Sequence, residues 1–377
     1  HDADNPDSLS DNAITAIFQD SHNNLWFGTA NGLNRFNREN ETFQHFNPVT
    51  NVPHNLRGAN VSAIVQDSQG NIWVSTQDGG LNLFNAQTNQ FSSYPHAAKN
   101  PNSPASDEIN TLLADQKRGI WIGTNTGLDY FDVVSGQFTH FKHNISDNAS
   151  LADDQILSLY QDRVGVLWVG TAEGGLDRFN SGGATFTHYR NNPENPYTLS
   201  SDQVHAIYED KSGHLWVGGR SGLNQFNRGD GYFTRFQHDP NDAHSLSNDA
   251  VLSIYTDRAG VLWIGTFGGG ISKYVQNNER FALYQHRPGV STSLSNDVVY
   301  AIYEDREGGV WVGTMDGGLN RLDQEAGTFY AYQVKFTDPN GINNNDVRAI
   351  FEDHRGILWV GTNGGGLNRL DRETNLF

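Results

Sequence analysis

The chain has 377 residues, of which 36% are hydrophobic and 18% are charged, and its formal net charge is -18. An acidic chain does not offer the basic patch that neutralises phosphates, so we expect no nucleic acid partner. Cysteine is absent, which excludes disulfides and thiolate metal sites. No stretch approaches the roughly 18 apolar residues of a membrane-spanning helix, and the first residues are unlike a signal sequence. We therefore expect a packed globular protein without a membrane segment.

Tryptophan recurs every 47 or 48 residues and marks eight copies of one motif, at Trp26, Trp73, Trp121, Trp168, Trp216, Trp263, Trp311 and Trp359. Repeats of this length are typical of solenoids and propellers. Helical repeats are excluded because the apolar residues lack a 3.6-residue period and glycine is frequent. The regular spacing leaves no room for an inserted domain, so we predict one domain over residues 1–377.

The most complete copy predicts four short strands, called A to D in chain order. Strand A, over residues 299–303, is rich in β-branched and aromatic residues. An Asp-x-x-Gly turn from Asp305 to Gly308 leads to strand B over 310–314, which contains Trp311. A glycine turn opens strand C over 319–323, and a polar turn opens strand D over 329–332. Each copy is therefore a four-stranded meander.

A single sheet of such short strands cannot bury both faces, and radial stacking of four-stranded blades solves this problem. We predict an all-β fold, a single eight-bladed β-propeller of four-stranded antiparallel blades. The blades cover roughly residues 1–46, 47–94, 95–141, 142–189, 190–236, 237–284, 285–332 and 333–377. Because Phe377 is the first residue of the eighth strand D, we expect the last blade to lack most of its outer strand.

Aspartate begins the A-to-B turn in every copy, at Asp20, Asp67, Asp115, Asp162, Asp210, Asp257, Asp305 and Asp353. A ring of catalytic or metal-binding carboxylates is one interpretation. A residue present in every copy more simply belongs to the fold, so we expect these side chains to accept hydrogen bonds from the turn amides. We likewise expect the tryptophans to fill the space between blades.

Function is expected where the copies differ, on the face formed by the D-to-A and B-to-C loops. The residue five before the turn aspartate varies most, and the B-to-C loop varies as well. From these positions we predict ligand-binding residues whose rings, forked donors and amides suit sugars or carboxylates: Asn110, His205, Arg220, Phe267, Tyr300, Met315, Arg348 and Asn363. The alternative is an unconstrained surface, because isolated exposed apolar residues need no explanation.

Eight residues before the turn aspartate, seven of the eight copies carry Asp or Asn. Five of these could hold Ca²⁺ at the mouth of the central channel: Asp107, Asp154, Asp202, Asp249 and Asp297. We favour the simpler interpretation that each side chain caps the turn into strand A, since no compact D-x-D-x-D-G loop is present. We therefore predict no cofactor and keep metal binding as an option.

The string D-x-x-G-x-L-W-[VI]-G-T-x-x-G-G-L-x-R-[FL]-[ND] begins at Asp162 and Asp353 and, with one Val for Leu, at Asp305. It closely resembles the two-component regulator propeller repeat. The resemblance implies a ligand-binding sensor of a bacterial hybrid two-component protein, histidine kinase or diguanylate cyclase. It also implies a periplasmic or extracellular location, often an oligosaccharide ligand, and an output domain outside this chain. Many such sensors are similar to paired seven-bladed propellers followed by another β-domain, whereas eight repeats stand here.

Three functions remain open. The leading hypothesis is a non-enzymatic sensor module that binds a small molecule or oligosaccharide on the variable face. The second is a propeller polysaccharide lyase or hydrolase, in which His205, Tyr300 and Arg348 act as base, acid and carboxylate clamp. No G-x-S-x-G, H-E-x-x-H or P-loop motif supports it. The third is a protein-interaction scaffold, whose acidic surface would favour a basic partner.

Overall fold

The computed structural model describes residues 1–2, 4–48, 54–275, 280–335 and 341–377. Among them, no segment forms a helix with the length and hydropathy that crossing a bilayer takes. The fold is an all-β propeller of eight blades, as predicted. Seven blades are four-stranded antiparallel sheets, and the last blade has three strands.

The strands of the first four blades follow one another in each sheet without crossovers. Blade 1 contains β1 (Ile14–Gln19), β2 (Leu25–Thr29), β3 (Gly32–Asn37) and β4 (Thr42–Phe46). Blade 2 contains β5 (Val61–Gln66), β6 (Ile72–Thr76), β7 (Gly80–Asn85) and β8 (Gln90–Tyr94). Blade 3 contains β9 (Ile109–Ala114), β10 (Gly119–Thr124), β11 (Gly127–Asp132) and β12 (Gln137–Phe141). Blade 4 contains β13 (Ile156–Gln161), β14 (Leu167–Thr171), β15 (Leu176–Asn180) and β16 (Thr185–Tyr189).

The last four blades repeat this order. Blade 5 contains β17 (Val204–Glu209), β18 (Leu215–Gly219), β19 (Gly222–Phe226) and β20 (Phe233–Phe236). Blade 6 contains β21 (Val251–Thr256), β22 (Leu262–Thr266), β23 (Ile271–Val275) and β24 (Arg280–Tyr284). Blade 7 contains β25 (Val299–Glu304), β26 (Val310–Thr314), β27 (Gly318–Asp323) and β28 (Thr328–Tyr332). Blade 8 contains β29 (Val347–Glu352), β30 (Leu358–Thr362) and β31 (Leu367–Leu370).

The chain divides into two compact units. Unit 1 consists of His1–Glu173 and Asp177–Thr187, and unit 2 of Gly174–Leu176 and His188–Phe377. Unit 1 therefore holds blades 1 to 3 and most of blade 4, whereas unit 2 holds blades 5 to 8. The single domain over residues 1–377 stays a prediction.

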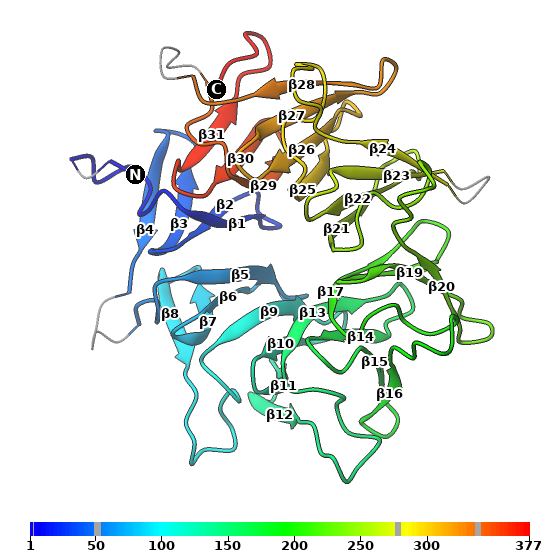
Figure 1. Cartoon of the computed structure of the whole chain (residues 1–377). Coiled ribbons are helices and arrows are strands. Elements are labelled where there is room, and N and C mark those ends of the chain that lie inside the picture. Colours follow the sequence, from blue (N-terminus) through cyan, green and yellow to red (C-terminus); the bar gives the residue numbers. More distant parts are fainter. Residues whose placement is uncertain (3, 49–53, 276–279, 336–340) are drawn as a thin grey trace. The chain divides into compact units, whose positions relative to one another are not determined.

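Within each unit, the first strands of neighbouring blades lie side by side (Figure 1). These strands are β1, β5, β9 and β13 in unit 1, and β17, β21, β25 and β29 in unit 2. Each is strand A of the predicted repeat and begins directly after a D-to-A loop. The residues at the beginnings of these strands are therefore neighbours within a unit, although about 47 residues separate them along the chain.

The strand limits predicted for the most complete copy are confirmed by β25 to β28, whose ends differ by no more than one residue. The short hairpin turns explain this agreement, because Gly and Asp mark where each strand stops. Blade 8 also ends as predicted, since the described residues after β31 form only a bridge between Asp371 and Leu376. Phe377 packs its ring 5.2 Å from that of Tyr332.

The turn aspartates have the structural role that we predicted. Oδ1 of Asp305 accepts the N–H groups of Glu307 and Gly309 at 3.0 and 2.8 Å. Its Oδ2 accepts the indole N–H of Trp311 at 2.8 Å. The same indole bond recurs at 2.8–3.0 Å in blades 1, 2, 4, 5, 6 and 8. In blade 3, Asp115 instead accepts a bond from the Tyr130 hydroxyl at 3.1 Å.

Six tryptophans pack toward the following blade of their unit, namely Trp26, Trp73, Trp121, Trp216, Trp263 and Trp311. Trp73 of blade 2 is fully buried in one cluster with Ile109 and Phe131 of blade 3. In strand B of blade 3, a glycine lets the next blade approach closely. A Cβ atom at Gly123 would lie 2.7 Å from the side chain of Ile156 in the next blade, so only glycine fits there.

A buried polar residue in strand C fastens each D-to-A loop. Asn224 is 2% exposed and accepts the backbone N–H of Ser200 at 2.9 Å. The same bond is made by Asn34, Asn82, Asp129, Asp177, Ser272, Asn320 and Asn368. We did not predict this role, although a polar residue at one buried strand position in every copy was the available signal. The loops that carry the variable residues are therefore anchored to the core.

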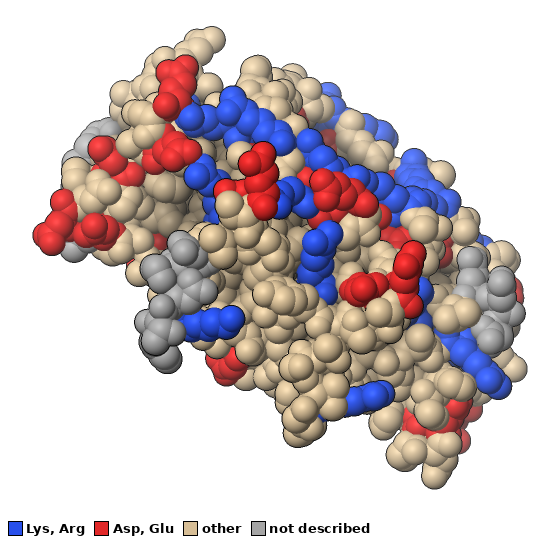
Figure 2. Space-filling model, turned by 90° about the horizontal axis from the view of Figure 1, so that it is seen from above, with Lys and Arg blue, Asp and Glu red and all other residues tan. Residues whose placement is uncertain are grey.

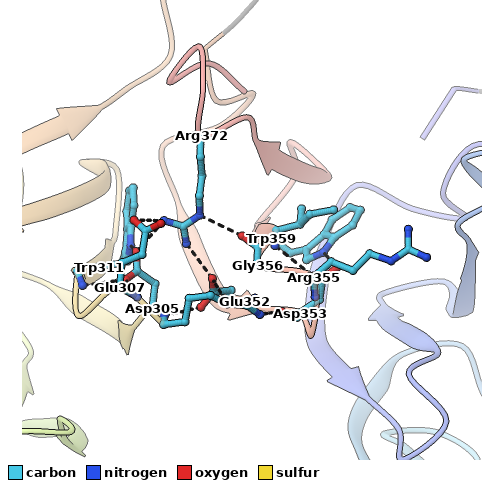
Figure 3. Close-up of polar contacts among 12 residues, drawn as sticks. Asp305, Glu307, Trp311, Glu352, Asp353, Arg355, Gly356, Trp359 and Arg372 are labelled. Carbon is cyan, nitrogen blue, oxygen red and sulfur yellow. Dashed lines mark hydrogen bonds and ion pairs between the residues drawn. The ribbon is translucent and has the colours of Figure 1, made fainter.

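Charged side chains join the A-to-B turns of blades 7 and 8 (Figure 3). Arg372 donates to Asp305, to Glu352 and to the carbonyl of Gly356, each at 3.0 Å. Burial works to raise the pKa of Asp305, but its bonds from Trp311, from the turn amide and from Arg372 outweigh burial and lower that pKa. These turns lie at the strand ends opposite to the D-to-A loops, so we assign this cluster to stability.

The basic side chains of the protein are not isolated from its acidic ones. Figure 2 shows Lys and Arg gathered into a band on the face that it draws, with Asp and Glu among them. In unit 2, Arg306 pairs with Glu352 at 3.0 Å and Arg228 pairs with Glu209 at 3.1 Å. These two arginines are therefore neutralised by carboxylates of their own chain.

Candidate functional site

Each strand A contains a β-bulge at the position that varies most between copies. In β25, Val299 pairs with Thr314 and Ala301 pairs with Gly313, so Tyr300 is the extra residue. The extra residues of the other seven strands are Thr15, Ser62, Asn110, Leu157, His205, Leu252 and Arg348. A bulge takes a residue out of the ladder and re-aims its side chain, and bulges are frequent beside functional sites. The variability of this position therefore has a structural cause.

Blades 7 and 8 bring four of the predicted ligand-binding residues together. The guanidinium carbon of Arg348 lies 3.8 Å from the centroid of the Tyr300 ring, and the Tyr300 hydroxyl lies 3.2 Å from the sulfur of Met315. Arg348 donates to Oδ2 of Asp346 at 2.8 Å, and its Nε forms an ion pair with Oδ1 at the same distance. Asp346 also accepts a bond from the side chain of Asn363 at 2.9 Å. We call these five residues the blade 7–8 cluster.

The blade 7–8 cluster combines an aromatic ring, a forked cation, an amide and a carboxylate. Burial works to lower the pKa of Arg348, but the bonds to Asp346 outweigh it and raise that pKa, so the guanidinium stays charged. The ring can stack on a ligand, the guanidinium can donate to a carboxylate or hydroxyl, and Asp346 can accept from hydroxyl groups.

Phe267 adjoins this cluster through the backbone. The residue forms an antiparallel bridge with Val298, two residues before Tyr300, and its N–H donates to the carbonyl of Ala250 at 2.8 Å. Its side chain is 52% exposed. An apolar ring held in the open beside a polar cluster suits contact with a ligand.

His205 and Arg220 belong to blade 5, separated from blade 7 by the first strand of blade 6. His205 is an exposed residue, yet partial desolvation by the surrounding protein lowers the pKa of its ring. In the described part of the chain, no hydrogen bond links His205 to Tyr300 or Arg348. The structure therefore does not assemble these three residues into one hydrogen-bonded catalytic group, as the enzyme hypothesis requires.

Asn110 lies in unit 1 and has partners of its own. Its side chain donates to the amide oxygen of Asn125 at 2.7 Å and to the carbonyl of Ile156 at 2.9 Å. Asn125 in turn donates to Glu108 at 3.0 Å. The structure therefore groups Asn110 with blades 3 and 4.

We missed two acidic residues in the sequence, Glu108 and Asp346, which directly precede strand A in blades 3 and 8. In the other copies this position holds Ala13, Asn60, Gln155, Gln203, Ala250 and Val298. The sequence did contain a signal for this role, since the position before strand A is acidic in only these two copies. In both blades the acid bonds the asparagine of the B-to-C loop, a pairing that sequence spacing alone does not reveal.

The five aspartates considered for a cation close the D-to-A loops. Asp249 accepts the backbone N–H of His238, eleven residues earlier, at 2.7 Å. Asp107, Asp154, Asp202 and Asp297 make the same bond at 2.6–2.7 Å. The bond reaches back to the start of the loop, whereas we expected a cap on the turn into strand A. The residues that the structure describes contain no group of three or more His, Cys, Asp or Glu that could hold a metal.

Two cavities lie at the outer strands, away from the bulged residues. One of about 370 Å³ in unit 1 is lined by Phe46, His54 and Phe91 among others. One of about 550 Å³ in unit 2 is lined by His244, Arg280 and Arg287 among others. Neither cavity includes a residue that we predicted as ligand-binding.

Seven segments of the chain match the family described as two component regulator propeller, namely residues 8–31, 55–78, 150–173, 198–221, 245–268, 293–316 and 341–364. Each segment runs from the D-to-A loop through strands A and B to the B-to-C loop. The third copy is not among them, and it is the copy in which Asp115 bonds Tyr130.

The chain is similar to the extracellular domain of BT3049 from B. thetaiotaomicron, described as a hybrid two component system. The identity is 22%, the likeness covers 98% of this chain and 65% of that one, and the TM-score is 0.51. For the extracellular domain of BT4673 from the same organism, the identity is 21%, the coverage 97% and 54%, and the TM-score 0.43. This chain thus spans less than two thirds of either domain.

A further similar structure is virginiamycin B lyase from Staphylococcus aureus, at 15% identity and a TM-score of 0.53, over 81% of this chain and 92% of that one. At these identities the likenesses show the fold alone. No curated protein matches the sequence. The eight tryptophan repeats, the bonds from turn aspartate to indole and the seven matching segments agree that the chain is built from two component regulator propeller repeats.

Proposed function

We propose that this chain is the extracytoplasmic ligand-binding sensor region of a bacterial two-component signalling protein. It binds a small molecule or oligosaccharide on the face formed by the D-to-A and B-to-C loops. The observation that carries this proposal is the blade 7–8 cluster, in which two adjacent bulges place Arg348 on the ring of Tyr300. The two component regulator propeller repeats, and the extracellular domain of BT3049, which shares the fold, support the sensor role.

The chemistry of the cluster favours a ring-shaped ligand that carries hydroxyl or carboxylate groups. Tyr300 offers a stacking face whose orientation is held by Met315 and Arg348. The guanidinium of Arg348 is oriented by Asp346 before the ligand arrives, which lowers the entropy that binding loses. Ligand occupancy is passed to an output domain outside this chain.

Binding is tested by calorimetric titration of the whole chain with a panel of neutral and acidic oligosaccharides. We expect Tyr300→Ala and Arg348→Ala each to weaken the binding of the responsive sugar by roughly tenfold or more. Arg220→Ala should have a smaller effect, because blade 6 lies between it and the cluster. The unfolding midpoint should change little, because these side chains are not in the core.

Arg321→Ala is the matched control, because Arg321 also lies over an aromatic ring, that of Trp311 at 5.5 Å, but in strand C. It should leave the affinity unchanged. The proposed face is wrong if Tyr300→Ala, Arg348→Ala and Arg220→Ala all bind as tightly as the unmodified chain.

The enzyme alternative is tested with the same protein. Incubation with uronate-containing polysaccharides should produce neither new double bonds nor new reducing ends. Products that disappear in His205→Ala would contradict the sensor proposal and support a lyase or hydrolase.

A further inference from the structure

The outer edge of blade 5 carries a pair of exposed tyrosines that the proposed ligand site does not use. Tyr197 lies in the loop before β17, and Tyr232 directly precedes β20. The two residues are 61% and 54% exposed, and their ring centroids are 5.7 Å apart with an angle of 37° between the planes. Two adjoining aromatic rings open to water form an apolar surface that favours a partner.

Backbone hydrogen bonds hold both tyrosines in place. The N–H of Tyr197 donates to the side-chain oxygen of Asn195 at 3.0 Å, and the N–H of Tyr232 donates to that of Asp230 at 3.1 Å. The N–H of Phe233 donates to the carbonyl of Tyr197 at 2.8 Å and joins the two segments. The rings are therefore presented by ordered turns.

Arg235 braces the loop that carries Tyr197. Its guanidinium lies within 2.7–3.1 Å of five oxygens of this loop, from Asn192, Asn195, Thr198 and Leu199. Pro193 and Pro196 further restrict the loop. The same position of strand D holds His45, Ser93, His140, His188, Leu283 and Ala331 in other blades. His45 and His140 each make one bond to the corresponding loop of their blade, whereas the five-bond arginine brace belongs to blade 5.

The fold does not require aromatic residues at these two positions. In blades 1 to 4, 6 and 7, the position of Tyr197 holds Asp7, His54, Asn102, Ala149, His244 and Thr292. The position of Tyr232 holds Thr42, Gln90, Gln137, Thr185, Arg280, Thr328 and Leu376 in the other blades. The pair of tyrosines is therefore a feature of blade 5 and not of the repeat.

We propose that Tyr197 and Tyr232 form a platform that binds the pyranose rings of a neutral polysaccharide. The apolar C–H face of a sugar packs on aromatic rings, while its hydroxyl groups need polar partners at the edge. The exposed Glu194 and Asp230 stand on the two segments that carry the tyrosines and can accept such bonds. Their charge, together with the net charge of -18, disfavours a polyanion.

The small size of the platform favours a sugar over a protein as its partner. A stable protein interface needs about 800 Å² on each partner, with apolar anchors at its centre. In blade 5, the exposed large hydrophobic residues among those described are Tyr197 and Tyr232, and polar residues surround them. Two partly exposed rings offer far less area than an interface, but they match one or two sugar rings. The platform does not depend on the blade 7–8 cluster.

The test is native gel electrophoresis of the whole chain with a soluble β-glucan, a mannan or an arabinoxylan in the gel. We expect at least one of these neutral polysaccharides to retard the protein. Tyr197→Ala and Tyr232→Ala should each weaken this binding roughly tenfold, whereas the Phe variants, which keep the ring, should retain most of it. Tyr330→Ala removes a tyrosine that is 58% exposed in blade 7, and it should bind as the unmodified chain does.

Three results would overturn the platform. The first is that none of the three polysaccharides retards the unmodified chain. The second is that Tyr300→Ala abolishes retardation while Tyr197→Ala does not, which assigns the binding to the blade 7–8 cluster. The third is that the unmodified chain forms a dimer which the Tyr197→Ala/Tyr232→Ala variant dissociates, which makes this surface an interface between two copies.

Discussion

In both units, the backbone N–H of the residue after a turn aspartate donates to the last side chain of strand A in the next blade. The two units use different side chains for this contact. In unit 1 the partners are neutral. The N–H of Ser21, directly after the turn aspartate, donates to the side chain of Gln66 in the next blade at 2.8 Å. The N–H of Gln116 donates to Gln161 in the same way at 2.9 Å.

In unit 2, the same positions are charged between blades 6 and 7 and between blades 7 and 8. The N–H of Arg258 donates to Glu304 at 2.7 Å, and its guanidinium reaches the carbonyl groups of the next A-to-B turn. The N–H of Arg306 donates to Glu352 at 2.6 Å, and its side chain pairs with the same carboxylate at 3.0 Å. Bonds to an ionised acceptor are shorter and stronger than neutral ones.

The comparison teaches that the backbone of the repeat sets the geometry of this contact, whereas the side chains decide how it responds to charge. Apolar packing between blades should therefore contribute equally in both units. Only in unit 2 should the strength of this contact depend on acid and salt.

The largest effect is expected from the tryptophans. Trp73→Ala in unit 1 and Trp311→Ala in unit 2 should each lower the free energy of unfolding by about 3–5 kcal/mol, because each removes a fully buried side chain. Urea denaturation followed by circular dichroism measures both. A difference of more than about 2 kcal/mol between the two variants would mean that packing is not equivalent in the two units.

The next largest effect should come from Arg372→Ala, which leaves Asp305 and Glu352 without this partner. Both carboxylates are nearly inaccessible, whereas the arginine side chain is 24% exposed, so we expect a loss of about 2–3 kcal/mol and not the full value of a buried pair. Thermal or urea unfolding measures it. Arg355→Ala, at an exposed arginine of the same turn region, is the control and should cost less than about 0.5 kcal/mol.

Acid should weaken this cluster through Asp305. Because its folded pKa lies below the ordinary value of 3.8, the carboxylate stabilises the fold above that value. This stability is lost as the pH falls through the folded pKa. The free energy of unfolding should thus decline as the pH falls from about 5 to below 3.8, and the decline should be shallower in Asp305→Asn. An unchanged slope would show that other carboxylates dominate the acid response.

The smallest effect should come from making a unit 2 contact resemble unit 1. Glu304→Gln keeps the acceptor but removes its charge, so we expect a loss of at most about 1 kcal/mol at low salt, since Arg258 is exposed. The midpoint of thermal unfolding in low and high salt measures it, and salt should reduce the difference. The reverse change Gln66→Glu in unit 1 should not stabilise the protein, because serine follows the turn aspartate there.

Much of the fold could be predicted from the sequence because each strand is short and ends at a turn whose residues have a clear conformational reason. The turn aspartates could be assigned in the same way, since Asp305 bonds residues within the same hairpin. Contacts over a few residues follow from local chemistry.

The candidate site was predictable only as a set of variable positions. We did not predict Asp346, because its role depends on its contacts with Arg348 and Asn363. Two strands separate Asp346 from Asn363 along the chain. The bulge at Tyr300 could not be predicted from the sequence either. A register shift belongs to a pair of strands, and neither strand shows it alone.

By itself, the sequence determined the number of blades, the order of strands in each blade and the residues that every copy shares. Only the tertiary structure decided which of the differing residues meet. Arg348 lies on Tyr300 because two first strands pack side by side and both contain a bulge. Tyr197 lies beside Tyr232 because a braced loop runs along the outer strand of its own blade. Such meetings depend on packing between segments that are distant in the chain, which a repeat period cannot specify.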